Sequence, residues 1–156
     1  CTVDGPWGRP DMSPILFASA IASGQPIKVF NHGKMMRDFT YIDDIVEGIL
    51  QVLVAPATSN ADWDALNPST ASSKAPYRIY NIGNATPIEL MYFIETIEKA
   101  MGKEAAKEYL PMQAGDVLKT FADVSELEKQ FDYHPTTSVE EGVQLFADWF
   151  KNYYKS

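Results

Sequence analysis

Residues 29–44 read VFNHGKMMRDFTYIDD, and this stretch sets the fold of the chain. Val29-Phe30 end a short run of β-forming residues that begins at Ile27 and predicts a strand. Asn31-His32-Gly33 predict a turn, because glycine adopts positive φ without steric cost and asparagine tolerates it. Met36–Tyr41 predict a second strand. The stretch therefore predicts two strands joined by a tight turn.

A helix is expected directly after these strands. Asp43 or Asp44 would cap it, since a carboxylate is favourable beside the positive N-terminus of a helix. Apolar residues at helical spacing define one face that is expected to pack against the rest of the protein: Ile45, Val46, Ile49, Leu50 and Leu53. Arg37, in the strand before this helix, can aim its planar guanidinium group at a phosphate. The alternative is a solvated arginine on a surface hairpin.

The composition is that of a globular protein. The chain has 156 residues, 46% of them hydrophobic, and this length is typical of one domain. No run of about 20 apolar residues occurs, so no membrane span is predicted. The net charge of -8 argues against a nucleic-acid partner, whose phosphates bind basic surfaces. The one cysteine, Cys1, excludes an internal disulfide and fits a reducing, cytoplasmic compartment.

Other elements follow from periodicity and capping residues. Helices are expected over Asp11–Ser23, Thr86–Met101, Ser125–Phe131 and Ser138–Lys151. Thr86 with Glu89, and Ser138 with Glu141, have the spacing of capping boxes. Strands are expected over Tyr77–Asn84 and Lys107–Leu110. Residues 55–76 break the periodicity and predict a long surface loop whose role stays open.

Several segments resemble the substrate lobe of nucleotide-sugar epimerases in the extended short-chain dehydrogenase/reductase family. Arg37-Asp38-Phe39, with Ile42 and Asp44, is similar to the family's Arg-Asp-(aromatic)-x-x-(Val/Ile)-x-Asp segment. Tyr80–Gly83 matches its Tyr-Asn-Ile-Gly strand, and residues 111–116 resemble its Arg-x-Gly-Asp loop, or the Gln-Pro-Gly-Asp form of uronate epimerases. Gly8–Met12 resembles the form in bacterial UDP-glucuronate 4-epimerases, the most similar members.

The resemblance covers Thr2–Tyr154 and implies a fold. Residues 1–156 would be the C-terminal, substrate-binding portion of such an enzyme, an α/β (α+β) lobe with remnant Rossmann strands. The chain starts without methionine, inside what reads as a strand, so we expect an N-terminal NAD-binding Rossmann domain upstream in a longer protein. The strand at Tyr77–Asn84 would then have an exposed edge, or would pair with another copy of the chain.

The resemblance also implies a UDP-sugar site. Arg37 would hold the diphosphate, Asp116 would accept hydrogen bonds from the ribose, and Thr2 would bond a sugar carboxylate. The expected substrate-binding residues are Thr2, Arg9, Met12, Val29, Phe30, Arg37, Gln113 and Asp116. Gln113 stands where other members have an arginine, which leaves Arg9 and Arg37 to hold the phosphates. Asp4 replaces the usual tyrosine and is expected to face away from the ligand.

Each of these residues also has a structural interpretation. Thr2 is a β-forming residue in a strand, Arg9 is a loop arginine in water, and Asp116 is a turn residue after Gly115. His32 and His134 are too isolated for a metal site and read as loop histidines.

The family's chemistry requires parts that this chain lacks. They are a glycine-rich NAD loop, a Tyr-x-x-x-Lys pair that includes the catalytic base, and a nearby Ser or Thr. No glycine triplet follows a strand, and neither Tyr92 nor Tyr109 has a lysine four residues on. We therefore expect no catalytic residue and no bound NAD in this chain, which would be inactive alone.

The full-length parent is expected to be an isomerase that interconverts UDP-glucuronate and UDP-galacturonate with NAD. Two alternatives stay open. One is the same lobe in a UDP-glucuronate decarboxylase or an NDP-sugar dehydratase, and the other is a non-catalytic nucleotide-sugar-binding module.

Overall fold

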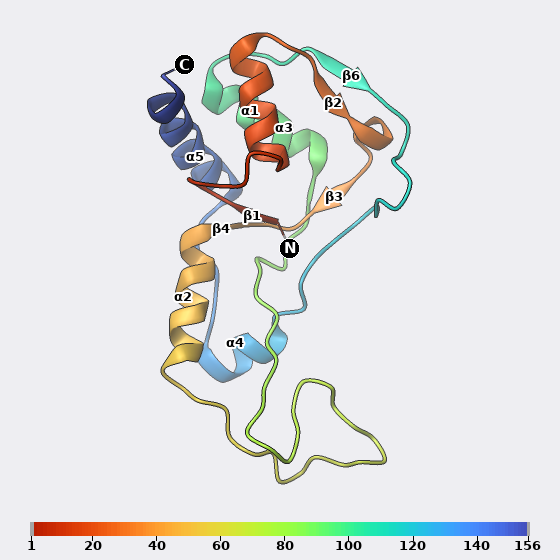
Figure 1. The fold of residues 1–156 in the computed structure, drawn as a ribbon, viewed down its shortest axis with the longest axis vertical. Helices are drawn as coiled ribbons and strands as arrows, with labels where there is room; N and C mark the ends of the chain where they lie inside the picture. Colours follow the sequence, from red (N-terminus) through yellow and green to blue (C-terminus); the bar gives the residue numbers. More distant parts are fainter. Residues whose placement is uncertain (1, 156) are drawn as a thin grey trace.

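A computed structural model describes residues 2–155, so the expectation placed on Cys1 lies outside the described residues. Six short strands and five α-helices occur in this range, which confirms the expected α/β class (Figure 1). The strands are β1 (Thr2–Asp4), β2 (Ile27–Val29), β3 (Met36–Arg37), β4 (Phe39–Tyr41), β5 (Ile88–Glu89) and β6 (Lys107–Tyr109). The helices are α1 (Ser13–Ser23), α2 (Ile42–Leu53), α3 (Leu90–Met101), α4 (Ser125–Phe131) and α5 (Val139–Tyr154), with a 3-10 turn, η1, at Phe30–Gly33.

The strands form three separate pairs. β1 lies parallel to β4, β2 lies parallel to β6, and β3 lies antiparallel to β5. The single strand expected over Met36–Tyr41 is therefore wrong, because its two halves pair with different partners. Asp38 lies at the division and is fully buried. Its Oδ2 accepts hydrogen bonds from the backbone N–H groups of Ala85 at 3.2 Å and Ala122 at 3.4 Å, which holds two distant loops at this point.

The hydrophobic core lies where α1, α3 and α5 pack around β2 and β4 (Figure 1). Phe39 of β4 stacks on Phe93 of α3 with 3.6 Å between the ring centroids. The other buried members come from all three helices and from β2: Phe17, Ile21, Ile27, Val29, Ile94, Ile97, Ala100, Val143 and Ala147. We call these helices with β1–β6 the core region.

Several expected helix ends are confirmed. Gly24 ends α1 with φ of 71°, the left-handed conformation that glycine adopts readily. Pro14 lies in the first turn of α1, where its missing N–H has no partner to lose. At the start of α5, the Ser138 hydroxyl accepts the backbone N–H of Glu141 at 3.1 Å.

Two other expected caps are wrong. Tyr41 occupies the N-cap of α2 with no side-chain cap, so neither Asp43 nor Asp44 caps that helix. The Thr86–Glu89 capping box does not form either, because α3 begins only at Leu90. Ile88-Glu89 pair with β3 instead, and this tertiary pairing outweighs the local capping pattern.

A second part of the molecule, which we call the α2 region, contains α2, α4 and residues 54–82; it extends below the core region in Figure 1. The expected burial of the apolar face of α2 is confirmed for Ile45 and wrong for Val46, Ile49, Leu50 and Leu53, which are 43–70% exposed. The strand expected over Tyr77–Asn84 is also wrong. In the described range this segment has only an isolated bridge between Ser72 and Arg78, because no neighbouring strand lies beside it. The loop at residues 55–76 lies at the end of the molecule farthest from α1 and β2.

Candidate substrate site

A cavity of about 480 Å³ lies beside α1, β2 and β3. Its lining is mostly apolar: Leu16, Phe17, Ala20, Pro26, Ile27, Phe30, Met35, Phe39 and Leu90. The polar residues that line it are Asp11, Ser13, Lys28, Arg37 and Asp116. An apolar cavity of this size with a few charged groups is typical of small-molecule binding sites.

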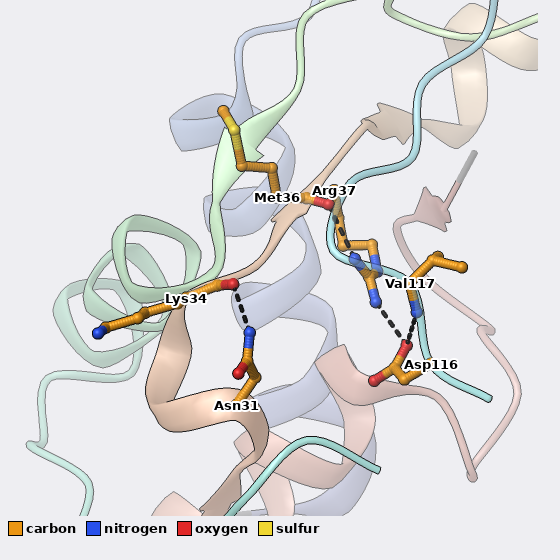
Figure 2. A network of polar contacts seen from close by, with 6 residues as sticks. All are labelled: Asn31, Lys34, Met36, Arg37, Asp116 and Val117. Carbon is orange, nitrogen blue, oxygen red and sulfur yellow. Dashed lines mark hydrogen bonds and ion pairs between the residues drawn. The ribbon is translucent and has the colours of Figure 1, made fainter. Parts of the chain in front are cut away.

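Arg37 and Asp116 form an ion pair at this cavity (Figure 2). The Arg37 Nη2 atom lies 2.8 Å from Asp116 Oδ1, and the two side chains are only 18% and 28% exposed. Arg37 Nη1 also donates to the Met36 carbonyl at 2.9 Å, while Asp116 Oδ1 accepts the Val117 N–H at 2.9 Å. Partial burial strengthens such a pair relative to one on the open surface. Two residues far apart in the sequence are thus brought to one wall of the cavity.

Local structure explains how the two charged residues reach this wall. Arg37 faces Ile88 across the β3–β5 pair, which fixes the direction of the strand. The preceding turn has positive φ at Asn31 and Gly33, as the sequence predicts, and also at His32. The Asn31 amide donates to the Lys34 carbonyl at 2.8 Å (Figure 2). Asp116 follows Gly115, whose φ of 83° reverses the loop after β6.

The structure brings three of the eight expected residues to the cavity, namely Phe30, Arg37 and Asp116. Gln113 is exposed on the same loop as Asp116, and its carbonyl accepts the Asp116 N–H at 3.2 Å. Val29 is completely buried in the core, and its carbonyl accepts the Leu110 N–H at 2.9 Å.

The remaining expected residues come from the N-terminal segment. Thr2 is half-buried in β1, opposite Phe39 of β4. Arg9 is exposed and forms a two-pronged ion pair with Asp11, with both N–O distances at 3.0 Å. Met12 is the N-cap residue of α1, and its sulfur lies 3.5 Å from Arg9 Nη2. Arg9 therefore does not line the cavity itself but is paired with a residue that does.

Sequence reasoning missed the wall that α1 contributes. Leu16, Phe17 and Ala20 line the cavity, and Leu16 is 52% exposed. The helical spacing of these residues indicates an apolar face, but the same spacing is expected of ordinary core residues. The signal available in the sequence is the position of this apolar helix, directly after the loop that carries Arg9.

Asp4 lies outside the cavity lining and is 5% exposed, which fits the expectation that it faces away from a ligand. Burial raises the pKa of Asp4 to about 6, and the nearby charge of Asp44 adds to the shift. Its Oδ1 atom has no hydrogen-bond partner among the described residues.

The turn from β1 into α1 does not fit the phosphates of a dinucleotide. The turn from β1 into α1 has two glycines, Gly5 and Gly8, but a Cβ at Gly5 would lie 2.7 Å from the Ile42 side chain, so this backbone is already covered. Pro6 and Pro10 also remove two amide donors from the turn. No NAD contact is therefore assigned to this turn.

Residues 2–155 also show no group of three His, Cys, Asp or Glu side chains placed to hold a metal ion. In the same range no helix has both the length and the apolar character needed to cross a membrane.

Comparison with known proteins identifies the family of this chain. The model of the NAD dependent epimerase/dehydratase family matches residues 1–83, which is more than half of the chain, so the chain belongs to that family. The short-chain dehydrogenase/reductase resemblance stated from the motifs is thereby confirmed.

Individual relatives narrow the comparison. The chain is 51% identical over 154 residues to Protein CapI of Staphylococcus aureus, covering 99% of this chain and 46% of that protein. It is 39% identical over 162 residues to UDP-glucuronate 4-epimerase 1 of Arabidopsis thaliana, covering 98% of this chain and 35% of the other. The chain thus spans less than half the length of these relatives.

A solved structure of a nucleotide-sugar epimerase has a similar fold. UDP-glucuronic acid 4-epimerase from Bacillus cereus, in complex with UDP-glucuronic acid and NAD, superimposes with a TM-score of 0.79 at 29% identity. The match covers 98% of this chain and 44% of that one.

Proposed function

We propose that this chain binds a UDP-sugar in the cavity beside α1, as the substrate lobe of a nucleotide-sugar epimerase. The observation behind the proposal is the Arg37–Asp116 pair at the wall of an otherwise apolar cavity. A guanidinium group matches the oxygens of a diphosphate, and a carboxylate accepts hydrogen bonds from ribose hydroxyls. The apolar residues offer a surface for the base.

Binding exchanges partners at this pair. Arg37 and Asp116 now neutralise each other, and a diphosphate competes with the carboxylate for the guanidinium because it has more negative charge and more acceptor oxygens. Arg37 Nη1 keeps its hydrogen bond to the Met36 carbonyl, which holds the guanidinium in place during the exchange. Asp116, once released, accepts the ribose hydroxyls.

The other expected residues complete the proposed site. Arg9 supplies a second cation for the phosphates, and Thr2 supplies a hydroxyl for the sugar carboxylate. Phe30 lies beside the uracil, while Met12, Val29 and Gln113 frame the site from the start of α1, from β2 and from the loop after β6. Family membership and the Bacillus cereus complex with UDP-glucuronic acid support a UDP-sugar site in this lobe, and the residue roles follow from the motif resemblance.

For the full-length protein, meaning the natural polypeptide that contains these residues, we propose interconversion of UDP-glucuronate and UDP-galacturonate. NAD, when bound, accepts and returns the hydride at C4 of the sugar. The residues of this chain hold the nucleotide half of the substrate and so position the sugar. They include no acid-base pair for the C4 hydroxyl, so this chain alone is proposed to be inactive.

We also propose that the full-length protein has an N-terminal NAD-binding Rossmann domain, which covers the exposed face of α2. A hollow of about 490 Å³ between α2 and residues 78–82, lined by apolar residues such as Ile49, Leu53 and Ile79, supports this assignment. The competing occupant is a second copy of the chain. An apolar dye such as ANS should bind to the hollow in this chain but not in the full-length protein, where the Rossmann domain would cover it. If a second copy covers the hollow instead, the sedimentation of this chain should depend on its concentration.

Calorimetric titration with UDP-glucuronate tests the binding site. Arg37→Ala in the full-length protein should weaken binding by about 1.5–3 kcal/mol, the contribution of a hydrogen bond to a charged group. Lys99→Ala is the matched control, since Lys99 is an exposed cation on α3 that lines neither the substrate cavity nor the hollow beside α2. Equal affinity of wild type and Arg37→Ala would show that the phosphates bind elsewhere.

Turnover tests the reaction. The full-length protein, supplied with UDP-glucuronate, should form UDP-galacturonate without releasing CO2. Release of CO2 would instead identify a decarboxylase, and epimerisation by this chain alone would refute its proposed inactivity.

A further inference from the structure

The loop between β1 and α1 contains an exposed tryptophan in an unfavourable backbone conformation. Trp7 has φ of 62° and is 71% exposed. Left-handed φ is uncommon for a residue with a large side chain and persists only where other contacts impose it. The proposed function uses Arg9 from this loop but gives no role to Trp7.

The ring of Trp7 packs on α5. Its centroid lies 5.3 Å from that of Trp149 and 4.9 Å from that of Tyr153, the second contact being edge-to-face. Trp149 in turn lies 6.0 Å from Phe146, which is 1% exposed and belongs to the buried cluster that α1 and α5 share. Trp7 therefore ties the exposed loop to a fixed part of the core region.

Arg9 follows two residues later on the same loop. Its guanidinium is held against Asp11, which lines the cavity, and its carbonyl accepts the Met12 N–H at 3.1 Å in a closed turn. Only Gly8 separates Trp7 from Arg9, so few backbone torsions lie between the two residues, and the turn from Arg9 to Met12 fixes the other side of Arg9 at the start of α1. A continuous series of contacts therefore connects the aromatic rings on α5, through Trp7 and Arg9, to the edge of the cavity.

We infer that Trp7 is a positioning residue for Arg9: its packing on α5 fixes the loop that presents the Arg9 guanidinium to the phosphates of the substrate. This inference rests on the proposed function, since it requires a UDP-sugar at the cavity. Trp7 itself does not contact the ligand. A loosely held arginine must be ordered when the ligand binds, and prior fixing of the loop removes part of that cost.

A double-mutant cycle on the full-length protein tests the inference, with UDP-glucuronate affinity measured by calorimetry. Trp7→Ala should weaken binding by about threefold or more, and Trp7→Phe should restore most of the loss. In the Arg9→Ala background, Trp7→Ala should cause no further loss. Trp7→Leu, which keeps apolar bulk without an aromatic ring, replaces Trp7→Ala if that variant does not fold.

Tyr92→Ala is the matched control. Tyr92 is a partly exposed aromatic residue of α3 that donates to Glu140 on α5, whereas the ring contacts of Trp7 are with Trp149 and Tyr153. This variant should lower the melting temperature without changing affinity. Additive losses in the cycle, or an equal loss of affinity in Tyr92→Ala, would overturn the positioning role.

The outcomes also separate this inference from the proposed function. If Arg37→Ala weakens binding while Trp7→Ala does not, the site stands and the role of Trp7 is refuted. If Arg37→Ala and Arg9→Ala both bind UDP-glucuronate like wild type, the proposed function itself fails.

Discussion

The core region and the α2 region bury their apolar residues to very different extents. Phe93 and Ile97 on α3 are completely buried, whereas Ile49 and Leu53 on α2 are 54% and 70% exposed. Both helices show the same apolar periodicity in the sequence. The comparison teaches that periodicity identifies the apolar face of a helix but does not identify what covers it.

The largest effect is expected where the core region is densest. Phe93→Ala removes a ring that stacks on Phe39 and leaves a cavity among three helices, so it should lower the free energy of unfolding by about 3–5 kcal/mol. Urea unfolding measures this value. A loss below about 1 kcal/mol would mean that the core region is no better packed than the α2 region.

Asp4, at the junction between the two regions, should make stability depend on pH. Its folded pKa of about 6 lies above its ordinary value of 3.8, so the folded state holds the proton more tightly. The stabilisation is therefore complete below pH 3.8 and is lost as the pH rises through about 6. Asp4→Asn abolishes this titration and leaves the neighbouring side chains of Asp44 and Tyr41 unchanged.

Unfolding of wild type and Asp4→Asn across this pH range measures the effect. Between pH 4 and pH 8 the variant should gain about 2–3 kcal/mol relative to wild type, following the size of the pKa shift. A constant difference between the two proteins over this range would show that Asp4 is not buried as described.

Asp44 links the two regions directly. Its carboxylate, on α2, accepts the backbone N–H groups of Thr136 at 3.1 Å and Thr137 at 3.2 Å, just before α5. Asp44→Ala leaves both donors without this acceptor and should cost about 1.5–3 kcal/mol of stability. Asp43→Ala is the matched control, because Asp43 lies in the same first turn but is exposed, so both variants lose the same interaction with the helix dipole. Equal losses would mean that the link contributes nothing.

Much of the core region could be predicted from local signals. Pro14 and Gly24 mark the ends of α1, and Ser138 marks the start of α5, because these residues act through their own backbone or side chain. Strand boundaries were less predictable. Met36–Tyr41 divides at Asp38, and Ile88-Glu89 leaves its expected helix, because each segment pairs with a strand distant in the sequence.

The site was also predicted only in part. The motif resemblance indicated that Arg37 and Asp116 serve one ligand, and the structure brings them to the wall of one cavity. The apolar wall from α1 was not predicted, since a leucine at helical spacing looks the same whether it faces a core or a cavity. The strand predicted over Tyr77–Asn84 was wrong for another reason. Its residues favour a strand, but a strand needs a neighbouring strand to pair with, and none of the described residues supplies one.

The smallest expected effect tests the α2 region. Leu53→Ser in this chain should change the free energy of unfolding by no more than about 0.5 kcal/mol, because the side chain is already 70% exposed. In the full-length protein the same change should cost several times more, since the proposed Rossmann domain would bury Leu53. Leu16→Ser is the control: its side chain is 52% exposed at the substrate cavity, so its effect on stability should be alike in both proteins. Urea unfolding of the two variants in both proteins makes the measurement. If Leu53→Ser costs equally little in the full-length protein, the face of α2 stays open there and the difference between the two regions is intrinsic to this fold.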